Sequence, residues 1–187
     1  MCIRDTTITR LNNNSITSIT DLPSGITSLP SSITSASGLS LGKVLQVVQT
    51  IKTNTDTSSS TSYVDCGMDV TITPSATSSK VMIMCYPRIG CNTGSANVFM
   101  KIRNNTAGSD VSADPFSVRR WASDGQSAYY TVSAPMVVVD SPNTSSAVQY
   151  KMQIKTNAGA WTMNMPANTG GYSDVERSTI IAMEIAQ

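Results

Sequence analysis

The stretch Val148-Gln-Tyr-Lys-Met-Gln-Ile-Lys155 alternates apolar and polar side chains at every position. Because successive side chains of a β-strand point to opposite faces, this pattern predicts a strand with one face in a core and one in water. The stretch 96–103 repeats the pattern with Val98, Met100 and Ile102. Further strands are expected at 44–53, 69–73, 81–91, 129–140, 161–165 and 178–186. Such a succession of about eight to ten short strands between turn clusters predicts an all-β fold, a jelly-roll-like antiparallel β-sandwich.

The stretch 81–91 differs because both of its faces are largely apolar. Val81, Ile83, Cys85 and Ile89 share one face, and the other carries Met82, Met84, Tyr86 and Arg88. We therefore expect a central strand that is packed on two sides.

Composition excludes several classes of function. The 187 residues include no histidine, only 13% are charged, and 13 basic residues nearly balance 12 acidic ones. Without histidine, the commonest general base and the usual His-bearing zinc sites are absent. With Arg119-Arg120 as the longest basic cluster, we expect no nucleic-acid partner. No apolar run reaches the ~20 residues that span a bilayer, and no secretory signal is recognisable, so we expect no membrane insertion and folding in a cytoplasm.

The cysteines show no metal-binding spacing. Cys2, Cys66, Cys85 and Cys91 form no CxxC pair, so we interpret them as small buried apolar residues. No run with the spacing of a calcium loop is present either, and we expect no metal and no cofactor.

Two physically different segments join near Gly42. All six leucines fall before residue 46, whereas every methionine after the first lies between Met68 and Met183. We therefore divide the chain into an N-terminal segment, 1–41, and a β-sandwich head, 42–187.

The N-terminal segment contains a seven-residue repeat. The repeat places apolar side chains at Ile19, Leu22, Ile26, Leu29 and Ile33. Pro23 and Pro30 within it argue against a helical coiled coil. We interpret the segment as an extended, non-helical stalk that orders against its own copies or another protein, with these five residues as candidate anchors. The alternative is a flexible low-complexity tail.

The last strand of the chain indicates self-assembly. Ile181, Met183 and Ile185 share one face, while Ile180 and Ala182 make the opposite face apolar as well. An apolar strand of this kind is a liability if it is exposed. We therefore predict a homo-oligomer with Ile181, Met183 and Ile185 in the subunit interface.

Five strings in order resemble one known family. They are Gly42-Lys-Val-Leu-Gln-Val-Val-Gln49, Ser59-Ser-Thr-Ser-Tyr-Val-Asp-Cys-Gly67, the stretch 70–84, the stretch 140–150 and Arg177-Ser-Thr-Ile-Ile-Ala-Met-Glu-Ile-Ala186. Together they are similar to the C-terminal head domain of tail-fibre-type virion proteins of tailed bacteriophages, many of them marine. The resemblance covers most of 42–187.

The resemblance implies a head that forms a homotrimer, as the C1q and tumour-necrosis-factor jelly rolls do, at the tip of an N-terminal shaft. It implies a virion location, folding in the host bacterial cytoplasm, and contact with a host surface glycan or protein. Only about 40 residues precede the head, too few for a long shaft. A short tail fibre is the first interpretation, and a capsid-attached decoration or head-fibre protein is the alternative.

The receptor surface is expected in the segment 116–130, where aromatic and cationic side chains gather. The candidates are Arg119, Arg120, Trp121, Tyr129 and Tyr130. The alternative for Trp121 is a place in the core or in the subunit interface. A glycan depolymerase is the third interpretation, with Asp110, Asp114 and Asp124 as the available carboxylates. We regard these as polar loop residues and predict no catalytic residue, so the chain is not expected to be an enzyme.

Overall fold

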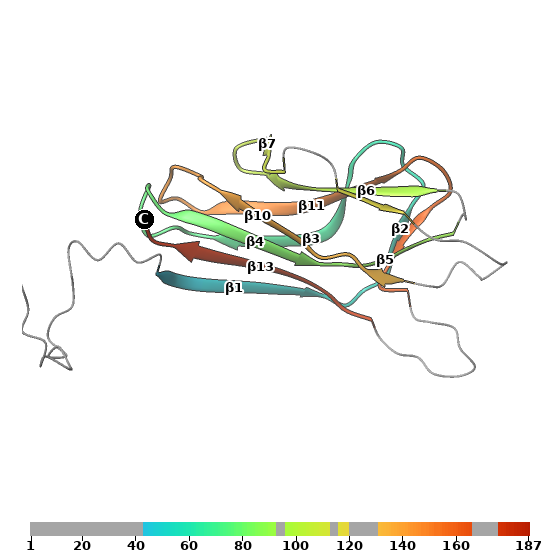
Figure 1. Ribbon diagram of the computed structural model, residues 1–187, viewed down its shortest axis with the longest axis horizontal. Helices are drawn as coiled ribbons and strands as arrows, with labels where there is room; N and C mark the ends of the chain where they lie inside the picture. Colours follow the sequence, from blue (N-terminus) through green and yellow to red (C-terminus); the bar gives the residue numbers. More distant parts are fainter. Residues whose placement is uncertain (1–42, 93–95, 113–115, 120–130, 166–175) are drawn as a thin grey trace, which may run out of the picture. The chain divides into compact units, whose positions relative to one another are not determined.

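The structure is a computed structural model that describes residues 43–92, 96–112, 116–119, 131–165 and 176–187 (Figure 1), with 116–119 described by their backbone. The chain divides into two units, Met1–Leu39 and Ser40–Gln187, and every described residue belongs to the second. The predicted N-terminal anchor, with Ile19, Leu22, Ile26, Leu29 and Ile33, lies outside the described residues.

The described residues form three antiparallel sheets. The first sheet, in spatial order, contains β1 (Val44–Lys52), β13 (Ser178–Ile185), β4 (Lys80–Tyr86) and β10 (Met136–Asp140). The second contains β3 (Val64–Ile72), β11 (Val148–Thr156), β6 (Asn97–Asn104) and β7 (Ser109–Asp110), with β8 (Phe116–Arg119) also paired to β6. The third is short and contains β2 (Asp56–Ser58), β12 (Trp161–Met163), β5 (Arg88–Cys91) and β9 (Val132–Ser133).

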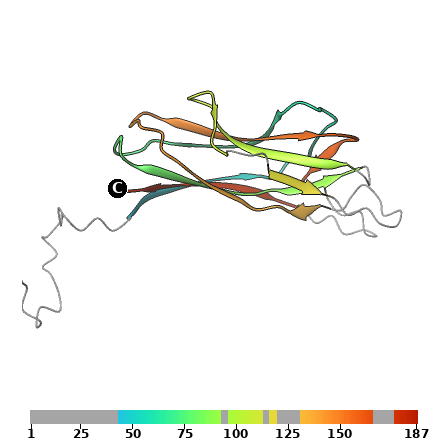
Figure 2. The same cartoon turned by 45° about the horizontal axis from the view of Figure 1, so that its top comes forward.

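The order of the strands defines a jelly roll. The chain alternates between the first two sheets, so that β1, β4, β10 and β13 belong to one and β3, β6, β8 and β11 to the other. Apart from β6 with β7 and β8, neighbours within these two sheets are therefore far apart in sequence, as in Greek-key connections. The two sheets form the layers of a sandwich (Figure 2), and the short third sheet extends it at one end (Figure 1). The all-β, jelly-roll-like fold predicted from the sequence is confirmed.

The core lies between the two main sheets. Val148, Tyr150, Met152 and Ile154 of β11 are buried, as their alternation predicts, and so are Val98, Met100 and Ile102 of β6. The largest fully buried side chains are Trp161 and Tyr150, and the hydroxyl of Tyr150 donates a hydrogen bond of 2.9 Å to Asp140. One contiguous apolar cluster thus spans both layers.

Three cysteines are part of this core. Cys66, Cys85 and Cys91 are buried and free, which confirms the prediction for these three, while Cys2 lies outside the described residues. Burial raises the pKa of the Cys66 thiol to about 12, and it also raises the pKa of Cys85.

Proline and glycine move several predicted strand boundaries. The expected strand 81–91 is divided at Pro87 into β4 and β5, and the expected strand 129–140 is divided into β9 and β10 around Pro135. Proline has no backbone N–H to donate to a neighbouring strand. Conversely, β3 begins five residues before the predicted start because Gly67, at φ +71°, lets the strand continue through a bulge opposite β11.

The expectation that 81–91 packs on two sides is not met for its first part by the described residues. Strand β4 is central in its sheet, between β13 and β10, and its Val81, Ile83 and Cys85 are buried. Its Met82 and Met84 face away from the core and are only half-buried. No described residue of another layer covers this side, because the sandwich has the second sheet on one side only.

Candidate functional site

The outward face of the β1-β13-β4-β10 sheet is almost entirely apolar. Strand pairing places side chains in rows across it, because residues opposite each other in antiparallel strands share a face. One row consists of Val139, Met82, Met183 and Val47, each paired with the next. The neighbouring row consists of Val137, Met84, Ile181 and Gln49. We call this the apolar face; it also includes Val44, Leu45, Ile51, Tyr86, Thr179, Lys80 and Ile185.

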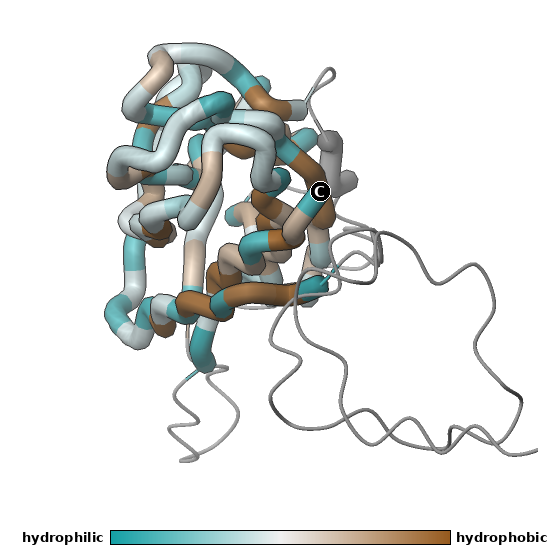
Figure 3. The backbone as a smooth tube through the Cα atoms, turned by 90° about the vertical axis from the view of Figure 1, so that its left-hand side faces the viewer, coloured by the Kyte–Doolittle hydropathy of each residue, from teal (hydrophilic) through white to brown (hydrophobic). Residues whose placement is uncertain are grey.

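The edges of the apolar face are the most exposed part of it. Val47 of β1 is 55% exposed, and Val137 and Val139 of β10 are 52% and 53% exposed. Lys80, at one end, is the charged residue that these strands place on the face. Figure 3 shows brown, hydrophobic segments in the lower part of the described head, where Figure 1 places β1 and β13. Soluble monomers rarely expose a continuous apolar surface of this kind, whereas interaction sites do.

The three predicted interface residues lie together in the middle of this face. Ile181, Met183 and Ile185 alternate with the buried Ile180, Ala182 and Glu184, so their side chains point outward from β13 and are half-buried by their neighbours. The sequence analysis missed the flanking residues of β1 and β10. The alternation of side chains in β10 could have identified Val137 and Val139 as outward-facing. Their place on this face could not be predicted, because it depends on the pairing of β10 with β4, which is distant in the sequence.

A buried carboxylate fixes the end of the same sheet. Glu184 is 1% exposed and accepts hydrogen bonds from the Ser75 backbone N–H and hydroxyl (2.6 Å each), the Ser79 hydroxyl (2.7 Å) and the Gln46 amide (2.7 Å). Burial raises the pKa of this carboxyl, but the hydrogen bonds from Ser75, Ser79 and Gln46 outweigh burial and hold the pKa at about 2. Glu184 therefore ties the turn before β4 and the start of β1 to β13.

A second buried polar cluster fixes the other end of β1. Asn164, at φ 51°, donates hydrogen bonds to the carbonyls of Lys52 (2.9 Å) and Asn54 (3.2 Å) and accepts one from the Ser178 hydroxyl (2.7 Å). The Ser178 hydroxyl in turn accepts a bond from the Arg88 N–H. These contacts join β1, β5 and β13, so both ends of β1 and β13 are held by buried hydrogen bonds.

The outward face of the second sheet is charged. Asp110 pairs with Lys101 (2.9 Å) and Arg103 (3.2 Å), and Asp65 pairs with Lys151 (2.9 Å). The hydrogen bond from Lys101 lowers the pKa of Asp110, with a further contribution from Arg103. A general acid needs a raised pKa, so the lowered pKa of Asp110 argues against that role for this residue. Asp114 and Asp124 lie outside the described residues.

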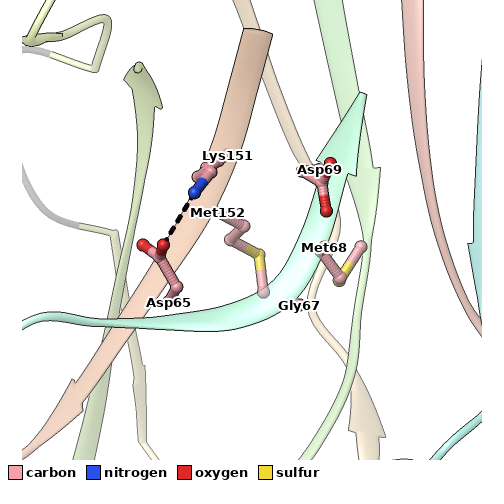
Figure 4. A pocket seen from close by; sticks show the side chains of 6 residues that line it. All are labelled: Asp65, Gly67, Met68, Asp69, Lys151 and Met152. Atoms are coloured by element: carbon pink, nitrogen blue, oxygen red, sulfur yellow. Dashed lines mark hydrogen bonds and ion pairs between the residues drawn. The ribbon is translucent and has the colours of Figure 1, made fainter. Parts of the chain in front are cut away.

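A small cavity lies beside the bulge of β3 (Figure 4). It has a volume of about 60 Å³ and is lined by Asp65, Gly67, Met68, Asp69, Lys151 and Met152. Pockets for small organic ligands are roughly 300–1,000 Å³, so this cavity has room for little more than a few water molecules.

The predicted receptor residues fall mostly outside the described residues. Arg120, Trp121, Tyr129 and Tyr130 are among the undescribed positions, and Arg119 is placed by its backbone, which pairs with Asn97 at the end of β8. The receptor surface therefore remains a prediction. Across the described ranges, no three metal-ligating side chains lie together, and no helix is long and apolar enough to span a membrane.

Comparison with known proteins identifies no family. No known protein-family profile matches the chain, and no curated protein matches it. Among solved structures, the crystal structure of the infectious bursal disease virus VP2 subviral particle is similar with a TM-score of 0.41 and 10% identity, over 75% of this chain and 38% of that one. A mutant VP2 of the same virus in derived T=1 particles has a TM-score of 0.38 and 12% identity, over 75% and 36%. This chain thus spans little more than a third of the length of either protein.

Proposed function

We propose that the chain is a virion structural protein whose head, residues 42–187, forms a homotrimer through the apolar face. We further propose that residues 1–41 attach the head to the particle and that the head contacts the host surface, as in a short tail fibre. The observation that supports self-assembly is the continuous apolar face across β1, β13, β4 and β10. Three copies is the number implied by the resemblance to tail-fibre-type heads.

Copies of the chain fit this face better than a charged partner would. Its members are mostly valine, isoleucine, leucine and methionine, with Tyr86, Gln49 and Thr179 as uncharged exceptions and Lys80 as a charged residue at one end. Burial of such side chains between subunits is favourable at about 25 cal/mol per Å². A specific interface buries more than about 1,000 Å², and the methionines of β4 and β13 can adapt to the facing surface.

The mass of the full-length protein in solution tests the assembly. Three copies of 19.8 kDa give a trimer of about 59 kDa by light scattering. Val47→Asp and Met183→Asp each place a charge on the apolar face, at directly paired positions. Val47 is half-exposed in a single subunit, so an aspartate at this position leaves the fold of the subunit intact. In the trimer, however, the same aspartate would be an unpaired charge buried in the interface. We expect monomers or aggregates from both variants.

Thr71→Asp is the matched control. Thr71 is exposed on β3, in the other sheet, and should leave the trimer unchanged. A wild-type monomer at micromolar concentration, or trimers from both Val47→Asp and Met183→Asp, would contradict the assembly proposal.

Attachment and adsorption are tested on the particle. Deleting residues 1–38 should give heads that no longer join the virion, and normal incorporation of the truncated protein would instead favour capsid decoration through the β-sandwich. Replacing Arg119, Trp121 and Tyr130 together with alanine should weaken adsorption to host cells while the trimer persists. Unchanged adsorption would place the receptor surface elsewhere on the head.

A further inference from the structure

The outward face of the second sheet contains a cation that no described carboxylate neutralises. Of the four basic residues on this face whose side chains the structure describes, Lys101, Arg103 and Lys151 each contact an aspartate within 3.2 Å. Lys155, at the end of β11, has no carboxylate partner among the described residues. An ammonium on a protein surface that lacks a fixed counter-ion is available to an anionic ligand.

Two aromatic rings hold this ammonium in place. The Nζ of Lys155 lies 4.7 Å from the ring centre of Tyr63 and 5.4 Å from that of Phe99. Phe99 is directly opposite Lys155 in the pairing of β6 with β11, and the Nζ of Lys101 lies 4.5 Å from the same Tyr63 ring. These contacts restrict the lysine side chains, so a ligand would lose less conformational entropy on binding here than at a freely moving lysine.

The hydroxyl of Tyr63 is a second unused polar group at this place. It is buried and has no hydrogen-bond partner within the described part of the chain. Its pKa is raised, by burial and by the charge of Asp110, so it stays a protonated donor at neutral pH. A ligand oxygen that reaches this hydroxyl would supply the missing hydrogen bond.

We propose that Lys155, Tyr63 and Phe99 form a binding site for a polysaccharide that carries a carboxylate on its sugar ring. One carboxylate has two oxygens, which match the Lys155 ammonium and the Tyr63 hydroxyl, the two groups here that have no polar partner within the described residues. The C–H face of the sugar packs on Phe99, because aromatic rings bind the apolar face of a sugar. A dianionic phosphate fits less well, because Asp110 and Asp65 lie on the same face and would repel the second charge.

The site fits the proposed assembly. If the apolar face is covered by copies of the chain, the outward face of the opposite sheet remains the exposed side of the sandwich. The inference therefore rests on the proposed contact with the host surface and names the chemistry of the ligand.

The test is a binding titration of the purified full-length protein with oligogalacturonate, which carries one carboxylate per sugar, and with neutral malto-oligosaccharide. We expect the protein to bind oligogalacturonate and not malto-oligosaccharide. Added salt should weaken this binding, because the attraction is between exposed charges. Lys155→Gln should reduce the affinity about tenfold or more, the usual effect of losing a hydrogen bond to a charged group. Tyr63→Phe should reduce it severalfold, and Lys155→Arg should retain binding.

Lys151→Gln is the matched control, because Lys151 lies on the same face of the same strand but is neutralised by Asp65. Absence of oligogalacturonate binding, unchanged affinity in Lys155→Gln, or an equal loss in Lys151→Gln would overturn the proposal. Light scattering on the same samples tests the homotrimer separately from the carboxylate-binding site. A trimer that does not bind refutes this site and leaves the assembly standing, whereas a monomer that binds refutes the assembly and leaves the site standing.

Discussion

Protonation of Glu184 should weaken the fold in a narrow acidic range. The pKa of this carboxyl is about 2 in the folded chain, against an ordinary value of 4.5. A group whose pKa is lowered by folding stabilises the protein above its unfolded pKa, and this stabilisation is lost as the pH falls toward the folded pKa. Each pKa unit corresponds to about 1.4 kcal/mol, so Glu184 contributes roughly 3 kcal/mol near neutral pH. That contribution should disappear between pH 4.5 and about pH 2.

Glu184→Gln isolates this contribution. One carboxylate oxygen accepts three bonds, from the Ser75 N–H and the Ser75 and Ser79 hydroxyls, and the other accepts one from the Gln46 amide. The glutamine oxygen can take over the three bonds as a weaker, neutral acceptor, but its NH₂ then faces the NH₂ of Gln46. Rotating the Gln46 amide would break its 2.6 Å bond to the Thr73 carbonyl. We therefore expect a loss of roughly 2–3 kcal/mol at pH 7.

Urea unfolding at fixed protein concentration from pH 7 to pH 2 measures the effect. The difference between wild type and Glu184→Gln should be largest above pH 4.5 and should shrink toward pH 2, where the wild-type carboxyl is protonating. Asp65→Asn is the control, because this carboxylate is half-exposed and ion-paired, and it should cost less than about 1 kcal/mol. If the free energy of unfolding falls by the same amount in the wild type and in Glu184→Gln between pH 7 and pH 2, the account of Glu184 is wrong.

Two further predictions concern the core. Asn164→Ala should lower the free energy of unfolding by about 2–4 kcal/mol, because it leaves the Lys52 and Asn54 carbonyls without their bonds and places alanine at φ 51°. Asn164→Gly, which tolerates that backbone, should cost less, and equal losses would show that the backbone conformation is unimportant. Cys66, Cys85 and Cys91 should resist alkylation at pH 8 in the native protein and react after unfolding in urea, as read by mass spectrometry, since burial raises the thiol pKa of the first two. Rapid native labelling of these cysteines would mean that the core opens.

The strand pattern of the sequence was sufficient to predict the fold class. Alternation in 148–155 and 96–103 assigned the inward side chains correctly, because the two-residue period of a strand is a local property of the chain. The boundaries were less accurate at Pro87 and Gly67, where a single residue ends a strand or lets it continue through a bulge. The final strand was correctly expected to be apolar on both faces.

The sequence by itself determined which side chains share a face of a strand, and the tertiary structure decided which faces are covered. Met82 and Met84 follow the same apolar pattern as Val81 and Ile83, so the pattern alone made β4 a strand packed on both sides. Only the order β1-β13-β4-β10 shows that no described layer covers one side of all four strands and that Val47, Met183, Met82 and Val139 form a single row. The same holds for Glu184, whose partners Gln46, Ser75 and Ser79 lie 105 to 138 residues away. It also holds for Lys155, whose aromatic contacts are Tyr63, just before β3, and Phe99 of β6. Pairing between distant strands depends on the register of the whole sheet, a property that no local stretch of sequence contains.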